Sequence, residues 1–318
     1  MMGPAKLWVI GVGTAMAVSA GSATGQTLYA ADNLTNGALS GVVLLDKATL
    51  TETNSFLTDP PIGGLATDGS NVYVSQPGGI SQYDSGGVLL GSYANVGIDK
   101  FGDLALSGNM LYAADNLTNG ALSGVVTLDT ASLTELSSFV TAGHIAGLAT
   151  NGADIFASLP DGIAEYSLDG TLVGSYANVG IDGFGALSFA DGTLYAADNL
   201  TNGALSGVVM LDASLTETGS FVTTGHIAGL VSDGTTTFAS LPDGITAYDN
   251  AGNVVGSYSN VGIDGFGALA MAAPAATGAV PEPAAWTFFV IGFGVIGWSR
   301  RQADIRKPQT LINRKICR

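Results

Sequence analysis

The stretch Leu28–Val43 reads LYAADNLTNGALSGVV, and it recurs without a change at Leu111–Val126 and at Leu194–Val209. Successive copies begin 83 residues apart. Identity this high at a constant spacing shows that the middle of the chain consists of tandem copies of one unit. The chain therefore contains three repeats, and any fold assigned to it has to be built from three similar parts.

Each 83-residue repeat divides again into two halves. A short segment of small residues around a leucine occurs six times, and the steps between successive leucines are 39, 44, 39, 43 and 39 residues. The six leucines are Leu65, Leu104, Leu148, Leu187, Leu230 and Leu269. Periods of about 40 to 45 residues that hold about four short strands are typical of β-propellers, in which each period forms one blade.

Residues 147–177 illustrate the expected blade. The segment GLAT at 147–150 is predicted to form an inner strand of small residues, and Asn151-Gly152 is predicted to form a hairpin turn. Three more strands are expected at 155–158, 164–168 and 172–176, separated by the loop PDG and the turn Asp169-Gly170. The blade would then be a four-stranded antiparallel sheet.

The two ends of the repeat region predict how the ring closes. Residues 27–31 resemble a second strand with no inner strand before them, and residues 266–272 resemble an inner strand with nothing after them. If the last strand completes the first blade, no sheet edge stays exposed at the closure. We therefore predict an all-β, six-bladed propeller built from three two-blade repeats and closed by the C-terminal strand. The alternative is an open β-solenoid or a string of β-sandwiches.

The charge balance narrows the range of partners. Between residues 26 and 279 there are 24 acidic residues against Lys47 and Lys100, a net charge of −22. Such a surface repels nucleic acid and anionic lipid. The only cysteine is Cys317, so residues 26–279 hold no disulfide and no thiol nucleophile. No Ser/His/Asp set and no phosphate-binding loop is apparent, so we predict no catalytic residue and no required cofactor.

The two ends of the chain resemble targeting signals. Lys6 precedes an apolar stretch over residues 7–20, and small residues near Ala23 offer a cleavage site, as in a signal peptide. Near the other end, Pro281-Glu282-Pro283 and Trp286 precede an uncharged stretch over 284–298, which is followed by Arg300-Arg301. That stretch would be about 22 Å long as a helix, which is short for a permanent membrane anchor.

This C-terminal pattern resembles the PEP-CTERM sorting signal of Gram-negative bacteria. The resemblance implies export, processing by an exosortase at the inner membrane, and release or attachment at the cell surface or outside the cell. A plain C-terminal membrane anchor is the alternative. The predicted organisation is a signal peptide at 1–25, the propeller at 26–272, a linker at 273–279, the sorting signal at 280–301 with a transmembrane helix at 284–298, and a basic cytoplasmic tail at 302–318.

The loops that enter the inner strands are the candidate functional region. In chain order they carry Pro61, Asp99, His144, Asp182, His226 and Asp264. Crowded carboxylates repel one another, and a hard cation relieves that repulsion. We therefore predict a weak calcium site at Asp99, Asp182 and Asp264, on the same face as Asp32, Asp115 and Asp198. The alternative is a solvated acidic rim, with the histidines as ordinary loop residues and Asx turns at Asp32-Asn33 and its copies.

Two functions from different classes agree with this sequence. The first is a non-catalytic binding or structural protein of the cell surface, within an exopolysaccharide or biofilm matrix. Its partners would be the export machinery, the exosortase, and a polysaccharide or another surface protein. The second is a calcium-dependent propeller hydrolase, such as a lactonase or a glycosidase. Propeller hydrolases usually carry their catalytic residues in one or two blades only. The three repeats of this chain are nearly identical, and this favours the binding or structural protein.

Overall fold

The computed structural model describes residues 26–33, 40–59, 61–94, 101–116, 123–177, 183–199, 206–259 and 265–272. The chain divides into two units, Met1–Ala273 and Pro274–Arg318, and all described residues belong to the first. The signal-peptide region and the sorting residues Pro281, Glu282, Pro283, Trp286, Arg300 and Arg301 lie outside the described residues. Within the described ranges, no helix is long and apolar enough to cross a membrane.

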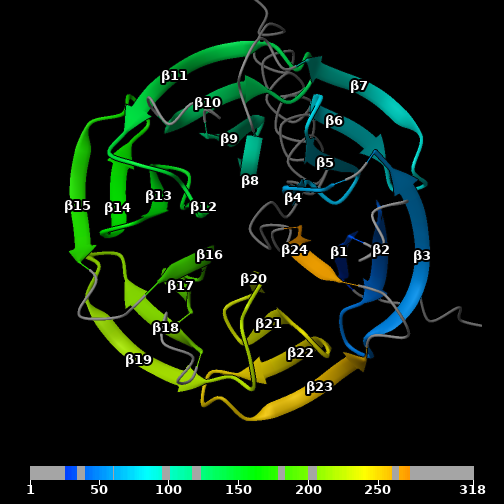
Figure 1. Ribbon diagram of the computed structural model, residues 1–318, viewed down its shortest axis with the longest axis vertical. Helices are drawn as coiled ribbons and strands as arrows, with labels where there is room; N and C mark the ends of the chain where they lie inside the picture. The colour runs from blue at the N-terminus through cyan, green and yellow to red at the C-terminus, as the bar shows by residue number, and fades with distance from the viewer. Residues whose placement is uncertain are drawn as a thin grey trace, which may run out of the picture. The chain divides into compact units, whose positions relative to one another are not determined.

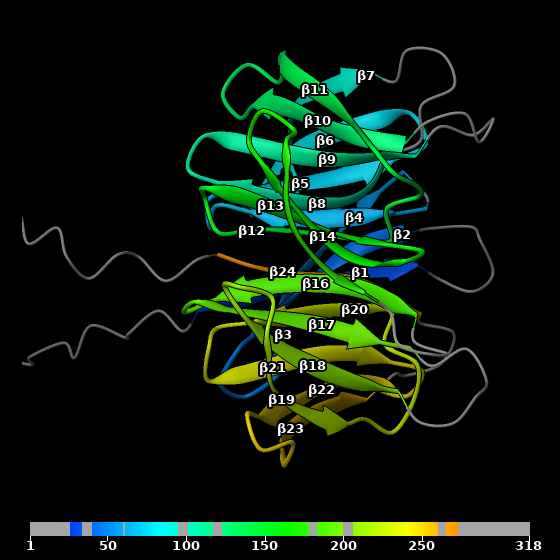
Figure 2. The ribbon, with the colours of Figure 1, turned by 90° about the vertical axis from the view of Figure 1, so that its left-hand side faces the viewer.

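The described residues form 24 strands in six antiparallel sheets of four strands, arranged as blades around a central axis (Figures 1 and 2). Within each blade the innermost strand is rich in small residues, because six strands have to crowd around the axis; β4, β12 and β20 are only four residues long. Hairpin turns join the strands, and Gly152 and Gly170 adopt φ values of +90° and +86° there, as the Asn-Gly and Asp-Gly signals predict. The predicted six-bladed propeller is confirmed.

The first three blades, from the inside outward, are formed by the following strands. They are β24 (Phe266–Met271), β1 (Thr27–Asn33), β2 (Ser40–Asp46) and β3 (Thr51–Thr58); β4 (Gly64–Thr67), β5 (Asn71–Gln76), β6 (Gly79–Asp84) and β7 (Leu89–Ala94); and β8 (Phe101–Ser107), β9 (Met110–Asn116), β10 (Ser123–Asp129) and β11 (Glu135–Thr141).

The last three blades follow the same order. They are β12 (Gly147–Thr150), β13 (Asp154–Leu159), β14 (Gly162–Ser167) and β15 (Leu172–Ala177); β16 (Phe184–Ala190), β17 (Thr193–Asp198), β18 (Gly207–Asp212) and β19 (Glu217–Val222); and β20 (Gly229–Ser232), β21 (Thr236–Leu241), β22 (Gly244–Asp249) and β23 (Val254–Ser259).

The last strand closes the first blade, as the sequence predicts. β24 pairs antiparallel with β1, with Leu28 opposite Met271 and Asp32 opposite Phe266. The two ends of the described chain therefore meet at one face of the ring, and the start of β24 lies at the opposite face. The side-chain amide of Gln26 donates a hydrogen bond to the carbonyl oxygen of Ala272 and so ties the two ends together.

An ion pair reinforces the junction between the sixth and the first blade. Lys47 Nζ lies 2.5 Å from Asp233 Oδ2 and 3.0 Å from Gln26 Oε1. Burial of Asp233 by itself would raise its pKa, but the hydrogen bonds from Lys47 and from the Thr235 and Thr236 backbone outweigh burial and lower the pKa to about 2. The other two repeats have Thr130 and Ala213 where the first has Lys47, so this contact belongs to the closure alone.

Two kinds of junction alternate around the ring. At the first kind, which we call the asparagine junctions, an asparagine at the end of a second strand binds the loop that enters the next blade. Asn116 Nδ2 donates to the carbonyl oxygen of Ile145, and Asn116 Oδ1 accepts from the Ile145 N–H, both at 2.8 Å. Asn33 binds Ile62 and Asn199 binds Ile227 in the same way. The predicted Asx turns are therefore wrong for these three asparagines, because their side chains reach the next blade; the residues that follow them in the predicted turns lie outside the described residues.

At the second kind, which we call the glycine junctions, inner strands of neighbouring blades approach closely. A methyl group on Gly64 would lie 2.5 Å from the carbonyl oxygen of Gly102, so only glycine fits there. Ser75 Oγ donates to that same carbonyl at 2.6 Å. The equivalent contacts join Gly147 and Ser158 to Gly185, and Gly229 and Ser240 to Gly267. One repeat of two blades thus supplies one junction of each kind.

Candidate functional site

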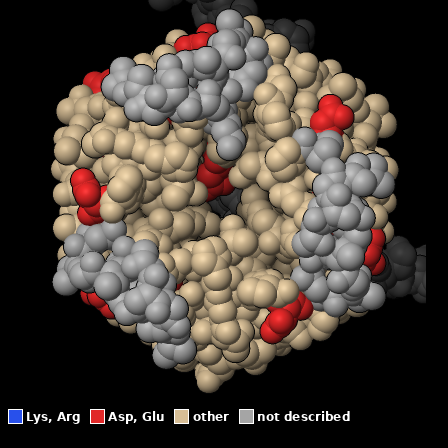
Figure 3. Space-filling model, viewed as in Figure 1, with Lys and Arg blue, Asp and Glu red and all other residues tan. Residues whose placement is uncertain are grey.

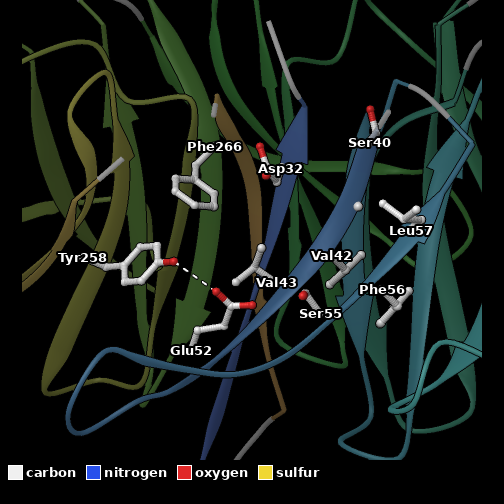
Figure 4. Close-up of a pocket in the computed structure, with 11 residues that line it drawn as sticks. Asp32, Ser40, Val42, Val43, Glu52, Ser55, Phe56, Leu57, Tyr258 and Phe266 are labelled. Atoms are coloured by element: carbon white, nitrogen blue, oxygen red, sulfur yellow. Dashed lines mark hydrogen bonds between the residues drawn. The ribbon is translucent and has the colours of Figure 1, made fainter. Parts of the chain in front are cut away.

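A groove opens at the glycine junction between the sixth and the first blade. It encloses about 310 Å³ and is lined by Asp32, Ser40, Gly41, Val42, Val43, Glu52, Ser55, Phe56, Leu57, Tyr258 and Phe266. Figure 4 shows Tyr258 and Glu52 facing each other across it, with Phe266 and Asp32 farther along. The Tyr258 hydroxyl lies 3.4 Å from Glu52 Oε2 and donates a hydrogen bond to it. The groove therefore combines aromatic rings, carboxylates and hydroxyl groups.

The pairing of the strands explains why these side chains meet. Successive residues of a strand point to opposite faces, and residues paired across strands share a face. Gly41 pairs with Leu57 and Val43 pairs with Ser55, so these four positions form one face of the first blade. A methyl group on Gly41 would lie 2.6 Å from the carbonyl oxygen of Phe56, so glycine is required there, and Leu57 is 65% exposed.

The same residues recur at the other two glycine junctions. Tyr93 packs on Phe101 with ring centroids 5.9 Å apart, and its hydroxyl lies 3.0 Å from Glu135 Oε2. Tyr176 packs on Phe184 at 5.8 Å, and its hydroxyl lies 3.3 Å from Glu217 Oε2. Tyr258 packs on Phe266 at 5.7 Å. The three positions that correspond to Leu57 are Leu57, Val140 and Val222.

Sequence reasoning missed the glutamates of these grooves. Residues 26–279 contain four glutamates, and three of them, Glu52, Glu135 and Glu217, occupy equivalent positions in the three repeats. Each follows a Leu-Thr pair near the start of an outer strand. The recurrence of so rare a residue was the signal that could have singled them out. The tyrosines and phenylalanines offered no comparable signal, because aromatic residues are expected between blades in any case.

The structure describes only part of the predicted loop face. Pro61, His144 and His226 are exposed, each in a loop that enters an inner strand and directly before an isoleucine held by an asparagine junction. Asp32, Asp115 and Asp198 lie at the ends of β1, β9 and β17, where they pair with the first residues of β24, β8 and β16. These side chains therefore share the face at which the inner strands begin.

The predicted calcium ligands Asp99, Asp182 and Asp264 lie outside the described residues. Among the residues that are described, no three His, Cys, Asp or Glu side chains form a group that could hold a metal ion. A calcium site at these three aspartates therefore stays a prediction.

One acidic residue breaks the threefold repetition at the axis. Asp103 is the only charged residue on the six inner strands, and the equivalent positions hold Ala186 and Ala268. Asp103 Oδ2 accepts a hydrogen bond from the Leu148 N–H of the next blade at 2.8 Å, and Oδ1 accepts from the Leu104 N–H at 3.0 Å. Burial raises the pKa of Asp103 to about 7, although these two hydrogen bonds act to lower it.

We expect replacement of Asp103 to stabilise the protein at high pH. The folded-state pKa of Asp103 is about 7 and the ordinary value is 3.8. Below pH 4 the carboxyl group is therefore protonated in both the folded and the unfolded state, and its burial does not lower the free energy of unfolding. As the pH rises from 4 to 7, the unfolded chain loses this proton and the folded chain keeps it, which lowers stability. Asp103→Asn should therefore raise the melting temperature by about 3–10 °C at pH 8 and hardly at all at pH 4.

The controls for this prediction are Asp103→Ala, which installs the residue of the other two repeats, and Asp161→Asn, which removes an exposed acid. Thermal melts of all four proteins at pH 4, 6 and 8 make the comparison. A gain that is the same at every pH would show that Asp103 is ionised in the folded protein throughout this range.

Comparisons with known proteins agree with the fold. No family model and no curated protein matches the sequence. Among solved structures, a protein of unknown function from Bacteroides caccae is 13% identical, with a TM-score of 0.61 over 77% of this chain and 98% of that chain. A chain of a nidogen/laminin complex is 16% identical, with a TM-score of 0.61 over 78% and 98%. Hydrazine synthase from Kuenenia stuttgartiensis is 13% identical, with a TM-score of 0.52 over 69% and 75%.

At these identities the likeness concerns the fold alone. The ring of six four-stranded sheets and these likenesses define the class of the protein as a six-bladed β-propeller. Its function has to be argued from the grooves and from Asp103, because one fold serves many functions.

Proposed function

We propose that this propeller is an exported, non-catalytic binding protein of the cell surface or its exopolysaccharide matrix, which holds a polysaccharide in its three grooves. The observation that carries the proposal is that the tyrosine, phenylalanine and glutamate of this groove recur with the same contacts at the other two glycine junctions, where we infer equivalent grooves. A sugar ring has apolar C–H faces that pack on aromatic rings and hydroxyl groups that donate to carboxylates. Three weak sites on one chain also suit a repeating polymer, because each bound unit raises the effective concentration of the next.

The groove extends between the two faces of the ring. Asp32 and Phe266, which line the groove, lie at the start of β24, whereas Gln26 and Ala272 lie at the opposite face of the ring. At the other end of the groove, Glu52 pairs with Leu45, next to the turn in which Lys47 contacts Gln26. Sorting through the PEP-CTERM-like signal, by an exosortase and with a transient stay in the inner membrane, completes this proposal.

The experiment is a glycan array probed with the purified full-length protein. We expect binding to at least one polysaccharide class, with about three sites per chain. The variant Leu57→Asn, Val140→Asn, Val222→Asn removes the exposed apolar part of each groove and should weaken binding at least tenfold. The matched control is Val88→Asn, Val173→Asn, Val255→Asn, which removes three valines of about 60% exposure that do not line the groove. Absence of binding to every glycan would refute the proposal.

A hydrolase is a second candidate, and Asp103 is the observation that favours it. An isolated carboxyl group with a pKa near 7 is suited to donate a proton at neutral pH, and special residues in one blade are expected of propeller enzymes. Hydrolysis of lactone or glycoside substrates by the wild type, lost in Asp103→Asn, would support this function and count against the non-catalytic one.

A further inference from the structure

The charges of the groove indicate which sugar it takes. Its lining contains two carboxylates, Asp32 and Glu52, and no lysine or arginine. The equivalent carboxylates of the other grooves are Asp115 and Glu135, and Asp198 and Glu217. Of the two basic residues between 26 and 279, Lys47 is bound to Asp233 at the closing junction and Lys100 lies outside the described residues. The lining of the groove between the sixth and the first blade therefore has acidic side chains and no lysine or arginine.

The face of the ring at which the inner strands begin also carries negative charge. Figure 3 shows acidic side chains distributed around this face and beside its central opening, with no lysine or arginine among the coloured residues. A concave site with one sign of charge raises the local concentration of ligands of the opposite sign. A chain of uronic acids or of sulfated sugars would meet repulsion from Asp32 and Glu52 in the groove.

The tyrosine and glutamate of each groove are suited to an ammonium group. Glu52 is exposed, and one of its carboxylate oxygens accepts from Tyr258, which leaves its remaining lone pairs for a further donor. An ammonium beside a tyrosine ring is also attracted by the negative face of that ring. A carboxylate and an aromatic ring across one junction thus form a pair that binds a cation more strongly than a neutral hydroxyl group.

We infer that the three grooves bind a polysaccharide of amino sugars with free amines, in preference to neutral or acidic polysaccharides. This inference rests on the proposed function, and it specifies the class of ligand for the same grooves. The choice of glutamate agrees with it. Glutamate occurs at only four positions between residues 26 and 279, and three of them bind the tyrosine of a glycine junction. Neutral sugars would be served equally well by glutamine.

The experiment is isothermal titration calorimetry of the full-length protein with chito-oligosaccharides of one length. The deacetylated oligomer carries amines, the N-acetylated oligomer is its neutral counterpart, and an alginate oligomer is the acidic probe. We expect the deacetylated oligomer to bind at least tenfold more tightly than the neutral one, and affinity for it to fall as salt is raised from 50 to 200 mM, because exposed charge pairs are screened. Alginate should not bind measurably.

The decisive variant is Glu52→Gln, Glu135→Gln, Glu217→Gln, which keeps the shape of each groove and an acceptor for each tyrosine hydroxyl. It should lose the preference for the amine while its melting temperature stays close to that of the wild type. The control Asp161→Asn, Asp243→Asn removes exposed acids from loops outside the grooves and should keep the preference. If the control loses as much affinity as the glutamine variant, net charge and not the grooves attracts the polymer, and the inference is wrong.

The remaining outcomes separate this inference from the proposed function. Tighter binding of the neutral or the acidic oligomer would overturn the preference for amines and leave a polysaccharide-binding protein. Failure of all three oligomers, together with a blank glycan array, would overturn both.

Discussion

Deletion of residues 267–273 is expected to abolish the cooperative unfolding of the propeller. The deletion removes nearly all of β24, which completes the first blade and packs against the inner strands β20 and β4. Leu269 and Ala270 would be lost from the core, and the buried residues Leu28 and Ala30 of β1 would face an open sheet edge. The loss is comparable to the whole stability of a domain, about 5–15 kcal/mol, so we expect insoluble protein or a broad melt without a defined midpoint.

A matched deletion tests whether this effect comes from the strand or from the shortened chain. Removing residues 274–280 deletes the same number of residues directly after the ring and should leave the melting temperature unchanged. Differential scanning calorimetry of both full-length variants makes the comparison. A sharp transition of the 267–273 deletion at the wild-type temperature would contradict closure by β24.

The second large effect is expected from the asparagine junctions. Asn116 is buried, and its side chain satisfies both the N–H and the carbonyl oxygen of Ile145. Asn116→Ala removes two hydrogen bonds and leaves two backbone groups without partners, at about 1–3 kcal/mol for each such group. We expect a loss of about 2–4 kcal/mol in the free energy of unfolding, seen as a fall of about 5–15 °C in melting temperature.

Asn151→Ala is the control for this prediction. Asn151 Oδ1 also accepts two backbone hydrogen bonds, from Ala153 and Asp154, but at an exposed turn where water replaces them. Its replacement should cost less than about 1 kcal/mol. Chemical denaturation of the three proteins gives the free energies directly. Equal losses in the two variants would mean that burial of the junction does not strengthen it.

The number of blades and the closure of the ring were predictable because the signals involved are local. Two adjacent residues, Asn151-Gly152, are enough to indicate a hairpin, and the composition and length of a short segment are enough to indicate a strand. The segment at Thr27 lacks an inner strand before it, and the segment at Phe266 is an inner strand without a blade of its own. The two were therefore expected to pair. All of this follows from patterns within about ten residues, repeated at a constant spacing.

The site was predictable only in part, because the repeats indicate what the blades share and do not indicate where one blade differs. Near-identity of the repeats correctly indicated similar blades, but it gave no sign that one inner strand carries a charged residue. Asp103 stands where Ala186 and Ala268 stand in the other repeats, and a single carboxylate in an acidic chain is not conspicuous. The raised pKa comes from its surroundings at the axis, which no stretch of sequence contains.

The sequence by itself determined the strands, their grouping into six blades and the pairing of the last strand with the first, since backbone hydrogen bonding and turn chemistry are local properties. Only the tertiary structure decided how neighbouring blades meet. Asn33 binds Ile62, 29 residues away, instead of closing a turn, and Tyr258 meets Glu52 across 206 residues. Such contacts depend on which faces the closed ring brings together, so the grooves exist only in the folded protein.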